Sequence, residues 1–390
     1  MTAQTILPAN TLSGGYNVDN SVRMSGATVN LQRDFSGDGN RRTWTYSTWF
    51  KLSNIKQSGF FNWGKGNPEF SLRFESATSD TLNNYFRVSQ YDNSQIFDLV
   101  TTQFFTDPAA WGHMVVAFDT TQGTASNRIK VYFNGTQITS FSTESYPDEN
   151  FETFVNQASK KHYIGYADYQ PINGYLCETV FIDGQQLAPD QFGEFDEDSG
   201  IWKPIDVSGL TFGTNGYYLQ YKEAGTSQNA SGIGADTSGG TNHFAVDDVV
   251  ATDQSTDTCT NNFATLNSLA TGLDATLSEG NLKMVSATAT TRSGTASTIG
   301  LTAGKWFAEF KITGSANGIV GIAGTTQNRT ATDDDDIGNY PGRTQQGYGY
   351  LSGGSVYNNS SAVTGSFASF TTNDIIGVAV DLDGDLLYFY

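Results

Sequence analysis

The chain has 390 residues, of which only 16% are charged and 13% are aromatic. This composition, rich in Gly, Ser, Thr, Asn, Tyr and Phe, suits pleated strands and turns better than helix surfaces. The 40 acidic and 21 basic residues give a formal charge of −19, which argues against nucleic acid and anionic membranes as partners because their phosphates would be repelled. The length predicts two domains.

Alternating apolar residues and hairpin turns predict strands throughout the chain. In the first part they run over 44–52, 70–75, 85–91, 111–119, 128–133, 162–166, 175–182 and 217–221. Ile129, Val131 and Phe133 share one side of their strand, and Asn134-Gly135 then supplies the positive φ angles of a two-residue turn. We therefore expect an all-β fold built from β-sandwiches.

The composition changes after about residue 222, where a Gly-, Ser- and Asn-rich stretch is followed by a polar segment with isolated apolar anchors such as Phe244 and Val249. Short strands bounded by Gly resume at Gly304. We expect an N-terminal arm (1–20) that docks on another protein, a first sandwich (21–223), an extended polar connector (224–299) and an incomplete second sandwich (300–390). The last strand lacks a continuation, so we expect a longer natural chain.

Neither a leader nor a membrane span is expected. The start MTAQTILPAN lacks a basic region followed by an apolar one, and no apolar run reaches the length of a span. Cys177 and Cys259 show no CxxC spacing, so we expect free thiols and assembly in a reducing host cytoplasm.

Residues 21 to about 223 resemble a laminin-G-like, concanavalin-type jelly-roll module of bacteriophage virion proteins. The stretches that carry this resemblance are NRRTWTYSTWFKL, NRIKVYFNGTQITSF, INGYLCETVFIDGQQLAPDQFGEF and GLTFGTNGYYLQY, and STDTCTNNFATLNSL is similar to the connector that follows the module in such proteins. Residues 300–390 resemble a SPRY domain through GKWFAEFKI, GIVGIAG, GYGYLSGG and DIIGVAVDLDGDLLYFY.

The resemblance implies a structural subunit of a phage virion, of the tail-fibre or head-fibre type. Its implied partners are other virion proteins and a glycan or receptor on the host surface. A homo-oligomer is implied as well, and trimers are common in this setting. The competing interpretation is a decoration or connector protein that binds only other virion subunits.

Enzymatic activity is not expected. Concanavalin-type folds also include glucanases, whose active strand carries acids in a Glu-x-Asp-x-x-Glu pattern. The nearest string starts with Glu194 and Asp196 but has Ser199 in place of the third acid. There is no Gly-x-Ser-x-Gly motif, and His113, inside a predicted strand, reads as a packed residue. A glycan depolymerase is therefore the disfavoured alternative.

No motif demands a cofactor, and calcium is the one metal for which the sequence offers candidates. Asp333, Asp334, Asp335 and Asp336 form a run of carboxylates, although such runs are usually solvated loops. Asp381, Asp383 and Asp385 are better explained by a hairpin turn. Laminin-G-like proteins often hold calcium at one rim of the sandwich, so the resemblance makes Asp168 a further candidate, although no local feature singles it out.

Two loops have the composition of a glycan site, in which an aromatic face lies under a sugar and polar groups bind its hydroxyls. One contains Tyr166, Asp168 and Tyr169, and the other contains Tyr340 and Arg343. Most of the 19 tyrosines, however, are expected to pack on sheet faces or at subunit contacts.

Overall fold

The structure is a computed structural model that describes residues 15–26, 28–55, 58–64, 66–76, 84–167, 170–272, 275–286, 294–314, 318–324, 341–342, 345–365 and 367–390. In this part of the chain the only helical elements are the 3-10 turns η1 (Ala125–Asn127), η2 (Pro189–Gln191) and η3 (Ala251–Asp253), none of them long enough to cross a membrane. The predicted all-β fold class is confirmed. Ala9–Phe263 form one compact unit, the N-terminal sandwich, and Ala264–Tyr390 belong to another, the C-terminal unit.

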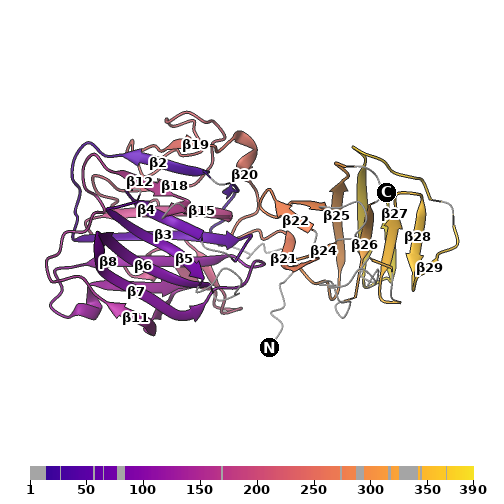
Figure 1. Ribbon diagram of the computed structural model, residues 1–390, viewed down its shortest axis with the longest axis horizontal. Coiled ribbons are helices and arrows are strands. Elements are labelled where there is room, and N and C mark those ends of the chain that lie inside the picture. Colours follow the sequence, from indigo (N-terminus) through magenta and orange to yellow (C-terminus); the bar gives the residue numbers. More distant parts are fainter. Residues whose placement is uncertain are drawn as a thin grey trace. The chain divides into compact units, whose positions relative to one another are not determined.

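The N-terminal sandwich consists of two eight-stranded antiparallel sheets (Figure 1). Sheet A has the order β10 (Thr136–Ile138), β9 (Ile129–Phe133), β8 (Gly112–Asp119), β3 (Thr43–Leu52), β15 (Gly174–Asp183), β1 (Ser21–Met24) and β20 (Gln254–Ser255), with β18 (Tyr217–Leu219) also paired to β15. Sheet B has the order β11 (Phe141–Ser145), β7 (Ser94–Phe104), β6 (Asn84–Asp92), β5 (Glu69–Ser76), β4 (Ser58–Trp63), β12 (Lys161–Ile164), β2 (Asn30–Asp34) and β19 (Ala245–Asp247). Two short ribbons pair β13 (Tyr166–Ala167) with β14 (Gln170–Pro171) and β16 (Gly193–Phe195) with β17 (Trp202–Pro204).

An aromatic core fills the space between the two sheets. Side chains alternate between the faces of a strand, so Trp44, Tyr46 and Phe50 of β3 all enter this core. The Trp44 ring stacks on Phe118 of β8 with centroids 4.1 Å apart, and the Tyr46 ring stacks on Phe61 of sheet B at 4.8 Å. Full burial of each such side chain contributes about 1.5–3 kcal/mol.

The outer face of sheet A is covered as well, which explains why β3 and β15 are buried on both sides. Val115, Val180 and Ile182 pack there against the segment after β15, and Trp49 and Cys177 pack against Trp202. The sequence pattern did not separate these outward residues from the core, because both faces of these strands carry apolar side chains.

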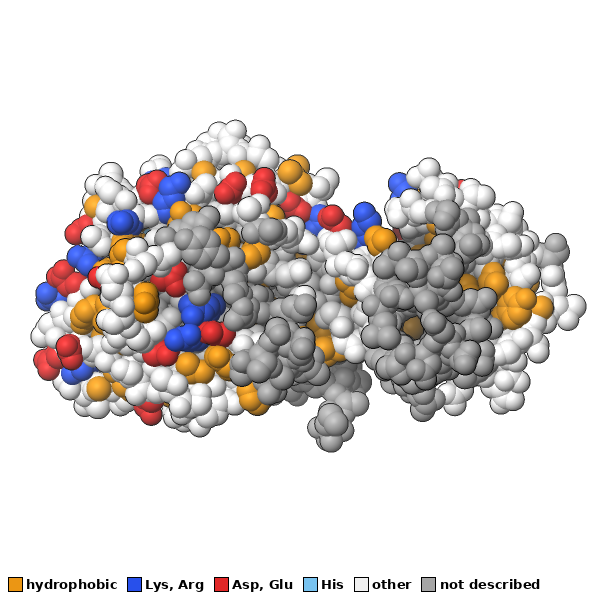
Figure 2. Space-filling model, viewed as in Figure 1, with side chains coloured by type: hydrophobic (Ala, Val, Ile, Leu, Met, Phe, Trp, Pro, Cys, Tyr) orange, Lys and Arg blue, Asp and Glu red, His pale blue; other side chains and the backbone are white. Residues whose placement is uncertain are grey.

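The surface of the N-terminal sandwich mixes both charge signs. Acidic and basic side chains are interspersed over the face shown in Figure 2. Arg41 and Arg42 pair with Glu152 at 3.2 and 3.0 Å, and such exposed pairs each contribute less than about 1 kcal/mol.

Residues 224–263 pack along the N-terminal sandwich, which therefore continues beyond the expected boundary at residue 223. β19 pairs with β2 and β20 pairs with β1, so this polar segment supplies edge strands to both sheets. An ion pair of 2.8 Å between Arg23 and Asp253 fastens the same segment.

The described residues of the C-terminal unit form four small sheets. β21 (Leu266–Thr271) pairs with β24 (Thr295–Ser297), and β22 (Ala275–Ser278) pairs with β23 (Lys283–Ser286). A three-stranded sheet follows the order β25 (Lys305–Lys311), β30 (Ile375–Asp381), β31 (Leu386–Phe389), and a four-stranded sheet follows the order β26 (Ile319–Ile322), β27 (Tyr348–Leu351), β28 (Ser355–Asn358), β29 (Ser361–Ala362). Tyr350, Val356, Phe370 and Ile376 form a common apolar cluster between the last two sheets.

The hairpin predicted around Asp381, Asp383 and Asp385 is confirmed. The Asp381 carboxylate accepts the backbone N–H of Asp383 at 3.2 Å and that of Gly384 at 3.0 Å, and it pairs with Lys305 at 3.0 Å. Through these contacts the Asp381 carboxylate stabilises the β30–β31 turn. The assignment of this unit to the SPRY type stays a prediction.

Candidate functional site

Of the five residues predicted to bind glycan, Tyr166 lies in the described part of the chain. Its side chain is only 5% exposed and its ring centroid lies 6.1 Å from that of Tyr163, so its ring has no open face for a sugar. Asp168, Tyr169, Tyr340 and Arg343 lie outside the described residues, as do the calcium candidates Asp333, Asp334, Asp335 and Asp336. Among the residues that are described, no group of three or more His, Cys, Asp or Glu side chains is placed to hold a metal ion.

His113 and Ser47 lie together in sheet A but do not form a nucleophilic pair. His113 Nδ1 accepts a hydrogen bond from Trp202 Nε1 at 3.0 Å, so the proton of the neutral imidazole is on Nε2. Nε2 lies 2.8 Å from Ser47 Oγ and therefore donates to the hydroxyl instead of removing its proton. Burial lowers the pKa of His113 to about 3, which keeps this arrangement at neutral pH. His113 is a structural residue, as the sequence predicted.

The string that starts at Glu194 forms a surface hairpin. Asp196 accepts the Ser199 backbone N–H at 2.9 Å, and both Glu194 and Asp196 lie within 3.3 Å of Lys203 Nζ. These carboxylates shape the β16–β17 turn and share one ammonium group, so they do not form an acid/base pair across a groove.

A second set of carboxylates lies on the outer face of sheet B, opposite the core face of β5. Arg87 binds Asp98 at 2.7 Å and Glu75 at 2.9 Å, and Arg73 binds Glu75 at 3.3 Å and Glu69 at 3.8 Å. Every carboxylate in this row contacts a guanidinium group. Glycoside hydrolysis needs one protonated acid beside one free carboxylate, and this row offers neither.

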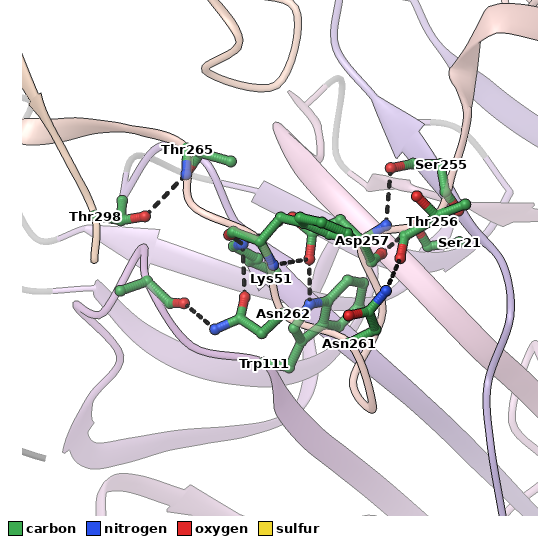
Figure 3. Close-up of polar contacts among 12 residues, drawn as sticks. Ser21, Lys51, Trp111, Ser255, Thr256, Asp257, Asn261, Asn262, Thr265 and Thr298 are labelled. Carbon is green, nitrogen blue, oxygen red and sulfur yellow. Dashed lines mark hydrogen bonds and ion pairs between the residues drawn. The ribbon is translucent and has the colours of Figure 1, made fainter. Parts of the chain in front are cut away.

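Lys51 is a buried cation with a complete set of acceptors (Figure 3). Its side chain is 1% exposed, and its Nζ donates to Asp257 at 2.8 Å, to Asn262 at 2.8 Å and to the Phe263 carbonyl at 2.6 Å. The other carboxylate oxygen of Asp257 accepts the Trp111 indole N–H at 2.9 Å. With every ammonium proton used, Lys51 fastens residues 254–263, named here the strap, to sheet A.

Glu178 is a buried acid at an irregular point of β15. The register against β3 shifts between Cys177 and Val180, and Glu178 takes a left-handed φ of 48° in this bulge. Its carboxyl group accepts hydrogen bonds from Tyr218 and Tyr16. Burial raises the pKa of Glu178 to about 7, and the two tyrosine hydroxyls partly oppose the shift.

An open groove of about 480 Å³ lies at the edge of the sandwich, where the chain passes from β10 of sheet A to β11 of sheet B. None of its lining residues is charged. Hydroxyl groups come from Thr102, Thr136, Thr139 and Ser140, amide groups from Gln103, Asn134 and Gln137, and apolar surface from Phe133 and Ile138.

The groove has a fixed floor and free polar groups at its rim. Phe133 is half-buried and packs edge-on against Phe105 with centroids 5.0 Å apart, and Asn134 accepts the His113 backbone N–H at 2.8 Å. The side chains of Gln103, Thr136, Gln137 and Thr139, by contrast, form no hydrogen bond with any residue that the structure describes. They are available to an outside ligand with hydroxyl groups.

Sequence reasoning found the hairpin that builds the groove but not the groove itself. Asn134-Gly135 was predicted as a turn, and φ angles of 47° and 76° confirm it. Gln103 belongs to β7 and Ser140 directly precedes β11, and their approach to this turn follows from the pairing of β11 with β7. Lys51 is the only charged residue of β3, and a single charge in a strand that is buried on both sides is a sequence signal of a buried ion pair.

The family comparison supports the fold of the N-terminal sandwich. A model of the concanavalin A-like lectin/glucanases superfamily, of the laminin G type, matches residues 24–186. A search of curated proteins found no match.

Several solved structures are similar to parts of this chain at low sequence identity and with low TM-scores. A heptameric SAP-like pentraxin from Limulus polyphemus is 16% identical over 45% of this chain and 80% of its own, with a TM-score of 0.33. A sialidase CBM40 module from Ruminococcus gnavus, bound to α2,3-sialyllactose, is 12% identical over 44% and 92%, with a TM-score of 0.29. The mouse laminin α1 LG4-5 domains are 10% identical over 97% and 76%, with a TM-score of 0.34. The family match over residues 24–186 and the two antiparallel sheets give the N-terminal sandwich a laminin G-like, concanavalin-like jelly-roll fold.

Proposed function

We propose that this chain is a non-enzymatic structural protein of a phage virion, a fibre or appendage subunit that attaches to a glycan on the host surface. Other virion proteins are its partners in the particle, and the subunit forms a homo-oligomer. The virion assignment rests on the sequence resemblance. The glycan assignment rests on the groove between Phe133 and Gln103.

The groove carries the proposal because its chemistry matches a saccharide. A sugar ring offers apolar C–H faces and many hydroxyls, which pair with an aromatic floor and with amide or hydroxyl groups. Phe133 provides the floor, and Gln103 and Gln137 provide free amides that both donate and accept. None of the lining residues has an ionisable acidic or basic side chain, so the groove is suited to binding and offers no acid or base.

The ligand class is an uncharged saccharide. Sialic or uronic acids carry carboxylates, and neither a Lys nor an Arg lines the groove to bind them. The formal charge of −19 also repels anionic chains at long range. A single shallow groove of this kind binds weakly, and several copies in an oligomer would raise the overall affinity through effective concentration.

A depolymerase is disfavoured by the carboxylates in the described part of the chain. Glu75 and Asp98 pair with Arg87, and Glu194 and Asp196 share Lys203. An acid and a base that face each other across the bound sugar are required for glycoside hydrolysis.

A connector role is the second candidate function, and one observation in the C-terminal unit favours it. On β25, β30 and the last strand, Phe307, Ile375, Tyr388 and Tyr390 are 47–70% exposed, and register places them on the same face of the three-stranded sheet. Apolar side chains gathered on one sheet face are typical of subunit contacts. This surface suits another virion protein.

A glycan array with the full chain, followed by calorimetric titration of the best neutral oligosaccharide, tests the attachment role. The double variant Gln103→Ala/Gln137→Ala should weaken binding about tenfold or more, because two hydrogen bonds are lost. Gln191→Ala, an exposed amide on η2 outside the groove, serves as the matched control and should bind normally. Silence on the array would favour the connector role instead. Binding that survives in the double variant would place the glycan elsewhere on the chain.

A further inference from the structure

We propose that Cys177 and Cys259 form a reversible oxidative modification site, at which a low-molecular-weight disulfide converts the two thiols into an intramolecular disulfide bond. Both are free thiols in the structure. Their Sγ atoms nevertheless lie 3.6 Å apart, although 82 positions separate the residues in sequence. A disulfide needs an S–S distance of about 2.05 Å, so a sulfur movement of less than about 2 Å suffices.

The two sulfur atoms are held face to face by the elements around them. Cys177 lies on β15, next to the Glu178 bulge, and its side chain is fully buried. Cys259 lies in the strap, where Thr258 Oγ1 donates to the Val18 carbonyl at 2.8 Å and the Val18 N–H donates to Thr260 Oγ1 at 3.0 Å. Both neighbours of Cys259 are therefore tied to the sandwich. Cys177 and Cys259 are therefore held in place as a pair, and do not simply lie in the same core.

Exposure decides the order of the two steps. The thiols of both residues are buried, but Cys259 lies in a partly exposed position of the strap, whereas Cys177 is fully buried on β15, so opening of the strap lets the oxidant R–S–S–R meet Cys259 first. The Cys259 thiolate attacks one sulfur of the oxidant, the R–S–S–R bond breaks, and one RSH leaves after taking up a proton. The Cys177 thiolate then attacks Cys259 Sγ and displaces the second RSH. Two protein thiols lose two protons and two electrons in all, and the oxidant is reduced to two RSH.

The surroundings make this oxidation slow in neutral solution. Burial raises the pKa of both thiols above the ordinary value, and only the thiolate reacts. The rate should therefore rise with pH. A chain assembled in a reducing compartment would keep both thiols and acquire the crosslink after release into oxidising surroundings.

The crosslink would bind the strap covalently to β15 of sheet A. It would close residues 177–259 into one loop and reduce the freedom of the unfolded chain. For a loop of this length we expect the melting temperature of the N-terminal sandwich to rise by on the order of 10 °C. The strap, which leads in sequence into the C-terminal unit, would then stay attached even without its Lys51 ion pair.

The test incubates the full chain with oxidised glutathione at about pH 8.5, the ordinary thiol pKa, and measures its intact mass after denaturation and alkylation. The expected product is lighter than the reduced protein by about 2 Da, has no alkylated thiol and no bound glutathione, and yields a 177–259 crosslinked peptide. A wild-type chain that still has two alkylatable thiols, or that retains glutathione, would overturn the proposal.

Single variants separate this pathway from nonspecific oxidation. Cys177→Ser should stop at the mixed disulfide and carry one glutathione on Cys259, and Cys259→Ser should resist the oxidant. Near-UV circular dichroism checks that each variant is folded, and Cys177→Ala replaces the serine variant if the buried hydroxyl proves disruptive. Glutathione on Cys177 in the Cys259→Ser chain would contradict the stated order of attack.

Discussion

Lys51 of β3 and Asp257 of the strap form a buried ion pair of 2.8 Å between residues 206 positions apart in sequence. Their side chains are 1% and 6% exposed, so both charges are held away from water. The pair survives burial because Asn262, the Phe263 carbonyl and Trp111 satisfy the remaining donors and acceptors. The pair links the strap to β3, in addition to the backbone pairing of β20 with β1.

Asp257→Asn should destabilise the N-terminal sandwich by about 3–5 kcal/mol, because the Lys51 amine would be left buried without its counter-ion. Urea unfolding followed by tryptophan fluorescence measures the change. Lys51→Met/Asp257→Asn should recover part of the loss, since the uncompensated charge is removed along with its partner.

The exposed pair between Arg42 and Glu152 provides the control for this measurement. Its side chains are 44% and 49% exposed, and Glu152→Gln should change the free energy of unfolding by less than about 1 kcal/mol. Equal losses of unfolding free energy for Asp257→Asn and Glu152→Gln would show that burial does not make the Lys51–Asp257 pair more important for stability.

Glu178 should make the sandwich less stable as the pH rises through neutrality. Its pKa is raised from 4.5 to about 7 in the folded chain, mainly by burial, so the folded state binds the proton more tightly than the unfolded state does. The stabilisation is fully present below about pH 4.5 and is lost as the pH approaches about 7. A shift of this size corresponds to about 3 kcal/mol.

The measurement compares urea midpoints of the wild type and of Glu178→Gln across this pH range. Other carboxylates in a chain of charge −19 also titrate, and the glutamine variant subtracts their contribution. The difference between the two proteins should shrink at low pH. If the urea midpoints of the two proteins change with pH in parallel, Glu178 does not have the raised pKa.

The strands of the N-terminal sandwich could be predicted from sequence because period-two patterns and Asn-Gly or Asp-Gly turns are local signals. β9, its turn at Asn134 and the strand β8 all formed where the pattern placed them. The approach of Cys259 to Cys177 could not be predicted, since it depends on where a polar segment without a pattern packs. The end of the N-terminal sandwich at Phe263 could not be predicted for the same reason.

The candidate site, too, could be predicted from the sequence only in part. An aromatic ring in a loop suggested Tyr166, but β13 buries that ring beside Tyr163. The groove at Phe133 is made from a turn and from the ends of strands that are distant in sequence. None of its polar residues, taken alone, indicates a binding site in the sequence. Only the pairing of β11 with β7 brings Gln103 and Ser140 into the same wall.

Gly135→Ala should disturb both the groove and the fold. Gly135 has a φ of 76°, and a Cβ at this position would lie 2.4 Å from the Trp202 ring. We expect a loss of about 2–3 kcal/mol from the strained backbone and the displaced ring, together with weaker glycan binding. Thermal unfolding and titration measure the two effects. Gly123→Ala, where a Cβ would meet nothing within 4 Å, is the matched control and should be nearly neutral.

Glycan binding in the groove should be nearly independent of salt. None of the nine lining residues is charged, so the contacts are hydrogen bonds and apolar packing that salt does not screen. Between about 0.05 and about 0.5 M sodium chloride the dissociation constant of a neutral oligosaccharide should change less than about twofold. Titration calorimetry at several salt concentrations provides the measurement. A steep loss of affinity with rising salt would mean that the glycan binds to a charged region instead. The row of Arg73 and Arg87 on sheet B is the first candidate for that region. In that case Arg87→Gln would abolish the salt dependence.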